Sequence, residues 1–181
     1  MKRRIWLVMA FVLVLSTVSL AENVALYSEV ESSSNYGGYN PSVVNDGERN
    51  YASEEGRWSE VAWASLDMPD DHWLEFWLPG KVNVKEIFIW WARDRGTFWY
   101  SEEIIIEADG KVVYDSTKSK DKNPLVKEVI RKQGDALGYQ VTEIYFKEPV
   151  RTDTIRIIQP AGGGNPERPN IMWVAEVEIY E

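Results

Sequence analysis

Short apolar segments rich in β-branched and aromatic residues run along most of this chain, and they are the feature that most constrains its fold. Such residues favour β-strands, and the last segment, from Trp173, also alternates with the period of two that is typical of a half-buried strand. Seven segments of this kind are present, at 73–79, 83–92, 102–108, 111–116, 140–147, 152–160 and 173–181. Polar turn sequences separate them, at 45–48, 78–81, 108–111 and 161–170. The sequence therefore predicts strands joined by turns, with a tight hairpin at Asp109-Gly110.

Evidence for helices is confined to one segment, residues 123–133. Its apolar residues have a spacing that a short helix can use, but two strands around a loop explain the pattern equally well. Many short strands with polar turns predict an all-β chain, folded as an antiparallel sandwich. The length after residue 21 suits one domain, 22–181, and is short for two.

The first 21 residues have the pattern of a secretory signal peptide. A basic start, MKRR, precedes about eleven apolar residues, and the segment ends in the small residues Ser19 and Ala21. A helix that spans a membrane needs about 20 apolar residues, so a membrane anchor is the less favoured alternative. We expect cleavage after Ala21 and a protein that is secreted, periplasmic or held at the cell surface.

Composition excludes several kinds of chemistry. The chain has no cysteine, so disulfides, thiol catalysis and cysteine-zinc sites are all excluded. The net charge of −9 becomes about −12 if Lys2, Arg3 and Arg4 leave with the signal peptide. Such a negative field disfavours nucleic acids and acidic membrane surfaces as partners.

Several short motifs occur in a recognisable order along the remaining chain. They are NVALYSEVESSS (23–34), NPSVVNDG (40–47), AWAS (62–65), HWLEFWLPG (72–80), VKEIFIWWA (84–92), SEEIIIEADGK (101–111), VRTDTIRI (150–157) and VAEVEIY (174–180). This order resembles the discoidin family, also called coagulation factor 5/8 type C, which includes bacterial carbohydrate-binding modules. The resemblance covers nearly all of residues 23–181. It implies a jelly-roll β-sandwich of the galactose-binding type, with ligand-binding loops at one end.

The chain departs from the family pattern in three places. The usual acidic residue before the strand-ending glycine is missing from FWLPG, and residues 48–61 lengthen the loop that follows Gly47. The cysteines that often tie the termini of animal members are absent. The absence of these cysteines favours a bacterial type of module over an animal adhesion or coagulation domain.

The same resemblance implies a structural calcium ion near the Asp-Gly loop. Members of the family hold the ion with an aspartate of this loop, backbone carbonyls and a glutamate of the last strand, and the matching residues are Asp46 and Glu176. Calcium takes six to eight oxygen ligands at about 2.4 Å, and the carbonyls of Val44, Glu48 or Ser53 would complete the shell. The alternative is that Asp46 only caps a turn and Glu176 faces solvent.

Tryptophan is abundant, with nine residues in the chain. An aromatic ring stacks on the C–H face of a sugar, whose hydroxyl groups form hydrogen bonds with arginine, amide or carboxylate groups. The tryptophans within strand segments and in AWAS are expected in the core: Trp63, Trp73, Trp77 and either Trp90 or Trp91. Trp58, Trp99 and Trp173 adjoin loops and remain candidates for a sugar site.

Two loops, 91–101 and 162–173, combine aromatic and polar residues. In related sugar-binding modules, an arginine after the tryptophan-rich strand and an aromatic residue near the final strand belong to the sugar site. By this resemblance, Arg93 or Arg95 together with Trp173 or Trp99 are the expected ligand contacts. Arg168 and Asn170 of the second loop are further candidates, and the single histidine, His72, is expected to reach the same end. A salt-bridged turn at 93–95 and a structural role for His72 are the alternatives.

No motif for a known catalytic centre is present. The chain lacks G-x-S-x-G and H-E-x-x-H, although its carboxylates leave a glycoside-hydrolase pair open. We expect a secreted, non-catalytic, lectin-like module that binds a glycan or polysaccharide. The alternative is an adhesion or scaffold domain that binds a protein or a membrane surface through the same loops, including a protein partner in the cell envelope.

Overall fold

The computed structural model describes residues 21–49, 57–94, 96–118, 125–131 and 139–181, with the course of the backbone alone at 125–131 and 139. These residues form ten strands: β1 (Glu29–Ser32), β2 (Trp63–Ala64), β3 (His72–Trp91), β4 (Arg93–Asp94), β5 (Thr97–Phe98), β6 (Ile105–Ala108), β7 (Lys111–Asp115), β8 (Leu125–Arg131), β9 (Tyr139–Gln159) and β10 (Trp173–Tyr180). Three single-turn 3-10 helices accompany them: η1 (Val24–Tyr27), η2 (Pro41–Asn45) and η3 (Trp58–Glu60).

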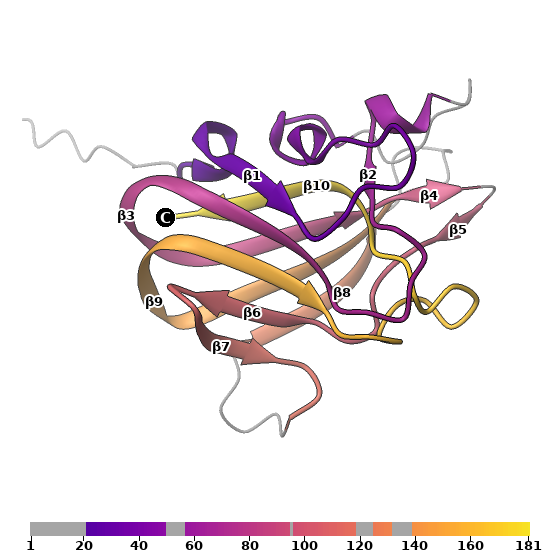
Figure 1. The fold of residues 1–181 in the computed structure, drawn as a ribbon. Coiled ribbons are helices and arrows are strands. Elements are labelled where there is room, and N and C mark those ends of the chain that lie inside the picture. The colour runs from indigo at the N-terminus through magenta and orange to yellow at the C-terminus, as the bar shows by residue number, and fades with distance from the viewer. Residues whose placement is uncertain (1–20, 50–56, 95, 119–124, 132–138) are drawn as a thin grey trace, which may run out of the picture.

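Two long strands, β3 and β9, build both layers of a sandwich. Their regular pairing is interrupted between Trp77 and Val82 and between Val84 and Glu86, where both strands bend over together (Figure 1). Residues 72–77 and 154–159 join β1, β6 and β7 in what we call the first sheet. Residues 86–91 and 141–145 join β2, β8 and β10 in the second sheet. All of these strand pairs are antiparallel, which confirms the predicted all-β jelly-roll sandwich.

The structure corrects the predicted boundaries in two ways. The segments 73–79 and 83–92 are one strand, as are 140–147 and 152–160, because hydrogen bonding continues through each bend. Residues 125–131 form strand β8 against β9, so the helical interpretation of 123–133 is wrong. The predicted signal peptide lies outside the described residues except for Ala21. Within the described part of the chain, no helix has the length and apolar character needed to cross a bilayer.

The main core lies between the two sheets. Leu74 and Phe76 of the first sheet face Ile87 and Ile89 of the second, and all four side chains are fully buried. Trp63 and Trp91 are also fully buried, as predicted. The other two core predictions fail, because Trp73 and Trp77 alternate with Leu74 and Phe76 and so point outward. Trp77 is 48% exposed and Trp73 is half-buried.

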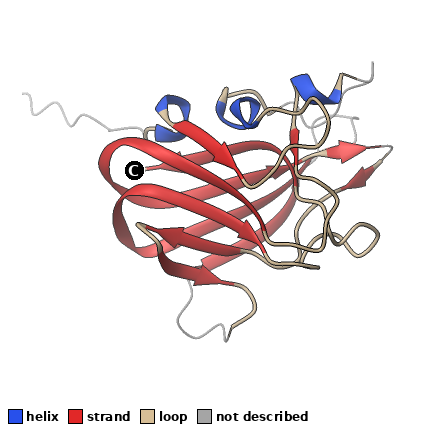
Figure 2. Cartoon of the chain, viewed as in Figure 1, coloured by secondary structure: helices blue, strands red, loops and turns tan. Residues whose placement is uncertain are grey.

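A β-bulge in β10 changes which residues share a face. The pairing with β3 shifts between Val174 and Glu176. Val174, Val177 and Ile179 therefore face the main core, whereas Ala175 joins Trp173 in a second cluster on the outer side of the sheet. Simple alternation would have placed Ala175 on the same face as Val177. The 3-10 helices η1 and η2 pack against β10, and their residues Val24, Ala25 and Val44 belong to the main core, so these helices close the edge of the sandwich beside β10 (Figure 2).

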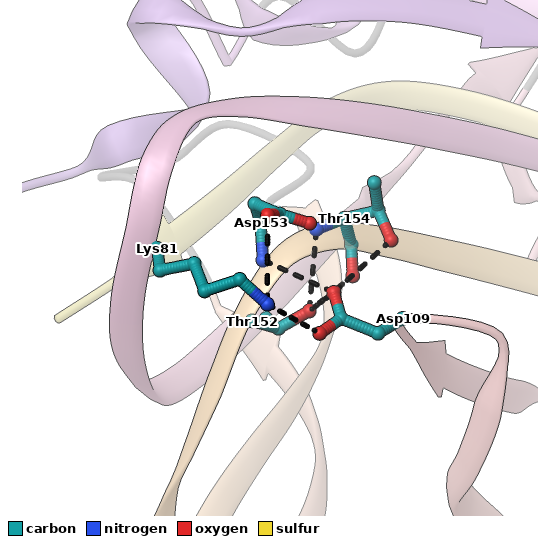
Figure 3. Close-up of polar contacts among 5 residues, drawn as sticks. All are labelled: Lys81, Asp109, Thr152, Asp153 and Thr154. Atoms are coloured by element: carbon teal, nitrogen blue, oxygen red, sulfur yellow. Dashed lines mark hydrogen bonds and ion pairs between the residues drawn. The ribbon is translucent and has the colours of Figure 1, made fainter.

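The predicted hairpin at Asp109-Gly110 is confirmed, and its aspartate also fastens the bend of β9. Asp109 and Gly110 have φ of 47° and 70°, as a tight hairpin of the type I′ kind requires. One carboxylate oxygen of Asp109 accepts hydrogen bonds from the Thr152 hydroxyl, at 2.6 Å, and from the Asp153 amide, at 3.2 Å. The other oxygen lies 3.3 Å from the Lys81 ammonium on the bend of β3 (Figure 3). These contacts, led by the Thr152 hydrogen bond, hold the pKa of Asp109 well below its usual value.

We predict that Thr152→Val lowers the melting temperature by a few degrees at neutral pH. The valine keeps the shape of this fully buried side chain but removes the hydroxyl that Asp109 accepts from. Because the pKa of Asp109 is lowered in the folded state, its contribution is present above about pH 4 and is lost as the pH falls below that value. The difference between the two melting temperatures should therefore shrink at low pH without vanishing, because the hydroxyl also bonds the backbone of Thr154. Thr154→Val, whose hydroxyl is 3.5 Å from the same carboxylate, is the control and should have a smaller effect.

Candidate functional site

The Asp-Gly loop lies directly against the middle of β10. The amide of Gly47 donates a hydrogen bond to Oε1 of Glu176 at 3.1 Å, and Asp46 accepts one from the amide of Glu48 at 2.8 Å. Gly47 has φ of 84°, and a Cβ at this position would lie 3.1 Å from the Leu26 side chain. Glycine is thus required where the loop turns toward the strand. The two carboxylates that the sequence analysis paired are brought together.

Glu176 is an unusual residue for a strand, because its side chain is fully buried. Its second oxygen, Oε2, is buried and accepts no hydrogen bond from the described residues. Burial, and then the charge of Asp46, raise the pKa of Glu176 to about 9, and burial also raises the pKa of Asp46. The interpretation of Glu176 as a solvent-facing residue is therefore wrong. A buried carboxylate with an unused oxygen beside a second acid has the donor chemistry that a cation needs.

The remaining ligands of such a cation would have to be neutral. Among the described residues, no three acidic or histidine side chains gather closely enough to form a complete metal site. The next acid along β10, Glu178, is paired with a cation of the protein: its Oε1 accepts a hydrogen bond from Arg49 at 2.6 Å, while its buried Oε2 has no hydrogen bond among the described residues. The Arg49 guanidinium also lies 4.3 Å from the centre of the Trp90 ring. Of the carbonyls predicted to help, that of Ser53 lies outside the described residues.

A cluster of aromatic rings occupies the end of the sandwich where β10 begins, and we call it the aromatic rim. Trp173 is at its centre. Its ring stacks on Trp99 with centroids 6.4 Å apart and meets Trp58 and Tyr39 edge-on at 5.4 and 6.2 Å. Tyr36 extends the cluster through an edge contact with Tyr39 at 6.1 Å. The five rings come from four separate segments of the chain, so only the folded sandwich assembles them.

Two residues predicted to contact the ligand are instead covered. Trp173 is 5% exposed and Arg93 is 9% exposed. The two lie close together, since the amide of Ala92 donates to the carbonyl of Trp173 at 3.2 Å, so the prediction that their turns meet at one end is confirmed. However, Trp173 supports the rings around it, and the Arg93 guanidinium lies 5.9 Å from the Phe98 ring. The prediction that Trp173 offers an open face to a ligand is wrong for this reason.

Arg168 and Trp99 are placed as the prediction requires. Both side chains are partly exposed, and the Arg168 guanidinium lies 5.8 Å from the centre of the Trp99 ring. Arg168 also forms an ion pair with Asp67 at 3.0 Å, in which both side chains reach solvent. The loop of Arg168 is fixed by Asn165, whose side-chain amide donates to the carbonyl of Phe98 at 3.0 Å.

His72 and Asn170 have structural contacts instead of free polar groups. His72 is 2% exposed, and its Nε2 lies 3.0 Å from the carbonyl of Met68 and 2.9 Å from that of Asn170. Two carbonyls can only accept, so Nε2 carries the proton and donates to them. His72 therefore has the structural role that the sequence analysis gave as the alternative to ligand binding, and it fastens two loops together. The Asn170 side chain remains half-exposed, and Arg95 lies outside the described residues.

The rim contains residues that the sequence analysis did not select. Tyr36 is 47% exposed and Tyr39 half-buried, and both come from the loop after β1. Burial and then the charge of Asp94 raise the pKa of Tyr39, while Arg168 lowers it, so both charged groups act on this ring. The two tyrosines in the glycine-rich stretch SNYGGYN were the available signal. The charged groups near these rings include Asp94 and Arg168, and Asp67 is paired with Arg168.

Comparison with known proteins identifies the fold. No protein-family model matches the sequence, and no curated protein matches it either. Among solved structures, a chitosan-binding module of a Paenibacillus chitosanase/glucanase has a TM-score of 0.62 at 19% identity, over 90% of this chain and 100% of that one. The family 32 carbohydrate-binding module of NanJ from C. perfringens, solved with galactose, has a TM-score of 0.59 at 17% identity, over 90% and 100%. A fucose-binding module from Streptococcus pneumoniae has a TM-score of 0.57 at 18% identity, over 88% and 98%. The chain therefore has the discoidin, or galactose-binding-like, fold, and these neighbours are carbohydrate-binding modules.

Proposed function

We propose that this protein is a non-catalytic carbohydrate-binding module that takes a sugar at the aromatic rim. The observation that carries the proposal is the joining of partly exposed rings to an accessible arginine–carboxylate pair at one end of the sandwich. Tyr36, Tyr39, Trp58 and Trp99 supply the rings, and Arg168 and Asp67 supply the pair. The carbohydrate-binding neighbours with the same fold support the same class of ligand.

The chemistry of the rim suits a sugar for two reasons. The C–H face of a sugar ring packs against the aromatic wall without requiring any polar group to lose its partner. The hydroxyl groups at the edge of the sugar ring accept hydrogen bonds from the Arg168 guanidinium and donate to Asp67 or Asp94. Hydrogen bonds to charged groups contribute about 1.5–3 kcal/mol each, and a few of them suffice for selective binding.

A glycan array followed by calorimetry on the strongest glycan tests the proposal. We predict that Arg168→Ala and Trp99→Ala each weaken binding by about 10- to 100-fold, the loss of one charged hydrogen bond or one stacked ring. Val112→Ala is the matched control, because this exposed apolar residue lies on β7, outside the rim. A protein that binds no glycan on the array, or one whose binding ignores both rim variants, would contradict the proposal.

We also propose that Asp46 and Glu176 hold a structural calcium ion. The unused oxygen of Glu176, the adjacent Asp46 and the tight turn at Gly47 support it. The ion would neutralise two neighbouring acids and fasten the 41–49 segment to β10. It would have no part in contacting the sugar.

Export completes the proposal. The pattern of residues 1–21 supports a secreted, periplasmic or surface-exposed protein, where glycans and polysaccharides occur. N-terminal sequencing of the protein recovered from outside the cytoplasm tests this point, and a start at Glu22 is the expected result. A partner protein in the cell envelope is compatible with the same location.

A further inference from the structure

The outer face of the first sheet carries side chains that the rim does not use. On β3, Trp73, Glu75 and Trp77 point outward, in register with Ile158, Arg156 and Thr154 of β9. No helix of the described residues covers this face, which looks toward the viewer in Figure 2. Trp77, at 48% exposed, is the only tryptophan among the exposed large apolar side chains of the described chain.

Acidic side chains surround Trp77 on this face. Glu29 of β1 is its direct neighbour across the strands, and Glu31 lies directly opposite Glu75. Like charges directly opposite in a sheet destabilise it, so the fold gains nothing from this arrangement. Glu107 of β6 is in register with Arg156 on the far side of the row.

Arg156, a cation on the same face, neutralises only part of this negative charge. Arg156 forms an ion pair with Glu75 at 3.0 Å and lies 4.7 Å from the centre of the Trp73 ring. No lysine or arginine of the described residues forms an ion pair with Glu29 or Glu31, and both glutamates are exposed. The face around Trp77 therefore keeps a net negative charge beside an accessible ring.

We propose that the outer face of the first sheet is a docking surface for the basic face of a partner protein, centred on Trp77. Arginine side chains of the partner would lie over the Trp77 ring and pair with Glu29 and Glu31, repeating the arrangement of Arg156 with Trp73 and Glu75. Charge complementarity supports this occupant over an acidic or neutral one. Tryptophan and arginine are also the residues most often found at the centre of protein interfaces.

The proposal prefers a protein to a cationic glycan because of the site's position. Sugar sites gather residues from several loops, as the rim does. Here the side chains come from paired strands of one sheet and spread across its outer face. Such a surface offers a broad contact area to a partner of similar size.

Calorimetry with an octa-arginine peptide on the full chain tests the proposal. The double variant Glu29→Gln/Glu31→Gln and the single variant Trp77→Ala are each expected to weaken binding by about tenfold or more. The matched controls are Glu102→Gln/Glu167→Gln, which removes the same charge from exposed positions elsewhere, and Leu66→Ala, which removes another exposed apolar side chain. Both controls should change the affinity less than about twofold, since only the overall charge or apolar area changes.

Several outcomes would overturn the proposal. Equal losses in the two double variants would mean that only the overall charge attracts the peptide. If Trp77→Ala bound the peptide as tightly as the wild type, the Trp77 ring would have no part in the docking surface. A glucosamine oligosaccharide that binds this face while the peptide does not would assign it to a glycan instead. Arg168→Ala should leave peptide binding unchanged, so failure of this proposal is distinguishable from failure of sugar binding at the rim.

Discussion

Replacing Glu176 with glutamine is expected to stabilise the protein in a chelating buffer and to abolish its response to calcium. The glutamine has the same shape and can still accept the hydrogen bond from the Gly47 amide. It carries no charge into a fully buried position beside Asp46, so the desolvation cost of the carboxylate disappears. The variant also lacks one of the two carboxylate charges proposed to hold the calcium ion, which leaves Asp46 as the only acid of the site. Thermal melts with EDTA and with calcium measure both effects.

The wild-type protein should respond in the opposite way. Calcium at 100 times its dissociation constant would add about 2.7 kcal/mol, which corresponds to a rise of about 5–10 °C in melting temperature for a domain of this size. In EDTA the raised pKa of Glu176 makes the folded state bind a proton that the unfolded state has released. Stability should therefore be greatest below about pH 4.5 for this group and should decline as the pH rises toward 9. Saturating calcium should remove much of this decline.

Asp109→Asn is a suitable control for these melts, because it removes a carboxylate at the hairpin far along the chain from the 41–49 segment. It should alter the stability without altering the calcium response. A wild-type melting temperature that is the same in EDTA and in calcium would contradict the cation proposal. A Glu176→Gln variant that still responds to calcium would show that any ion binds elsewhere.

The fold could be predicted because period-two alternation and turn chemistry depend only on local sequence. The Asp109-Gly110 hairpin and the strand at 173–180 were both identified in this way. The bulge before Glu176 was not, because it depends on the pairing of β10 with two neighbouring strands. The outward position of Trp77 was missed for the same reason. Alternation assigns the residues of a strand to two faces, but it does not say which face meets the core.

The candidate site was predictable only in part, for a related reason. The order of motifs indicated that Asp46 and Glu176 share a site and that the turns of Arg93 and Trp173 meet. Burial of Trp173 results from rings that arrive from the loop after β1 and from η3, far away in sequence. The contacts of His72 were likewise not predictable from the sequence, because its Nε2 bonds the carbonyls of Met68 and Asn170, and Asn170 lies far away along the chain. Long-range contacts of this kind leave no periodic signal in the sequence.

Replacing Trp63 with alanine is expected to cost about 3–5 kcal/mol of unfolding free energy, a large part of the 5–15 kcal/mol typical of a domain. The side chain is fully buried, and its indole N–H donates to Asn35 Oδ1 at 2.7 Å and lies 3.2 Å from the carbonyl of Ser34. The variant would therefore leave a cavity in the core and also release the loop that presents Tyr36. Urea titration should show a clearly lower midpoint.

Two further variants separate the cavity from the hydrogen bonds of Trp63. Trp63→Phe keeps most of the buried ring but removes the donor, so it should cost about 1–3 kcal/mol and weaken sugar binding through the loop at Asn35. Trp77→Ala removes the same kind of side chain from an exposed position and should change the unfolding free energy by less than about 1 kcal/mol. If Trp63→Ala unfolded at the same urea concentration as Trp77→Ala, Trp63 would not anchor the core. The rim is assembled from loops that are fastened to this core. A variant that disorders the 34–39 loop should therefore also lower the affinity for the sugar, even where the substituted residue does not touch the ligand.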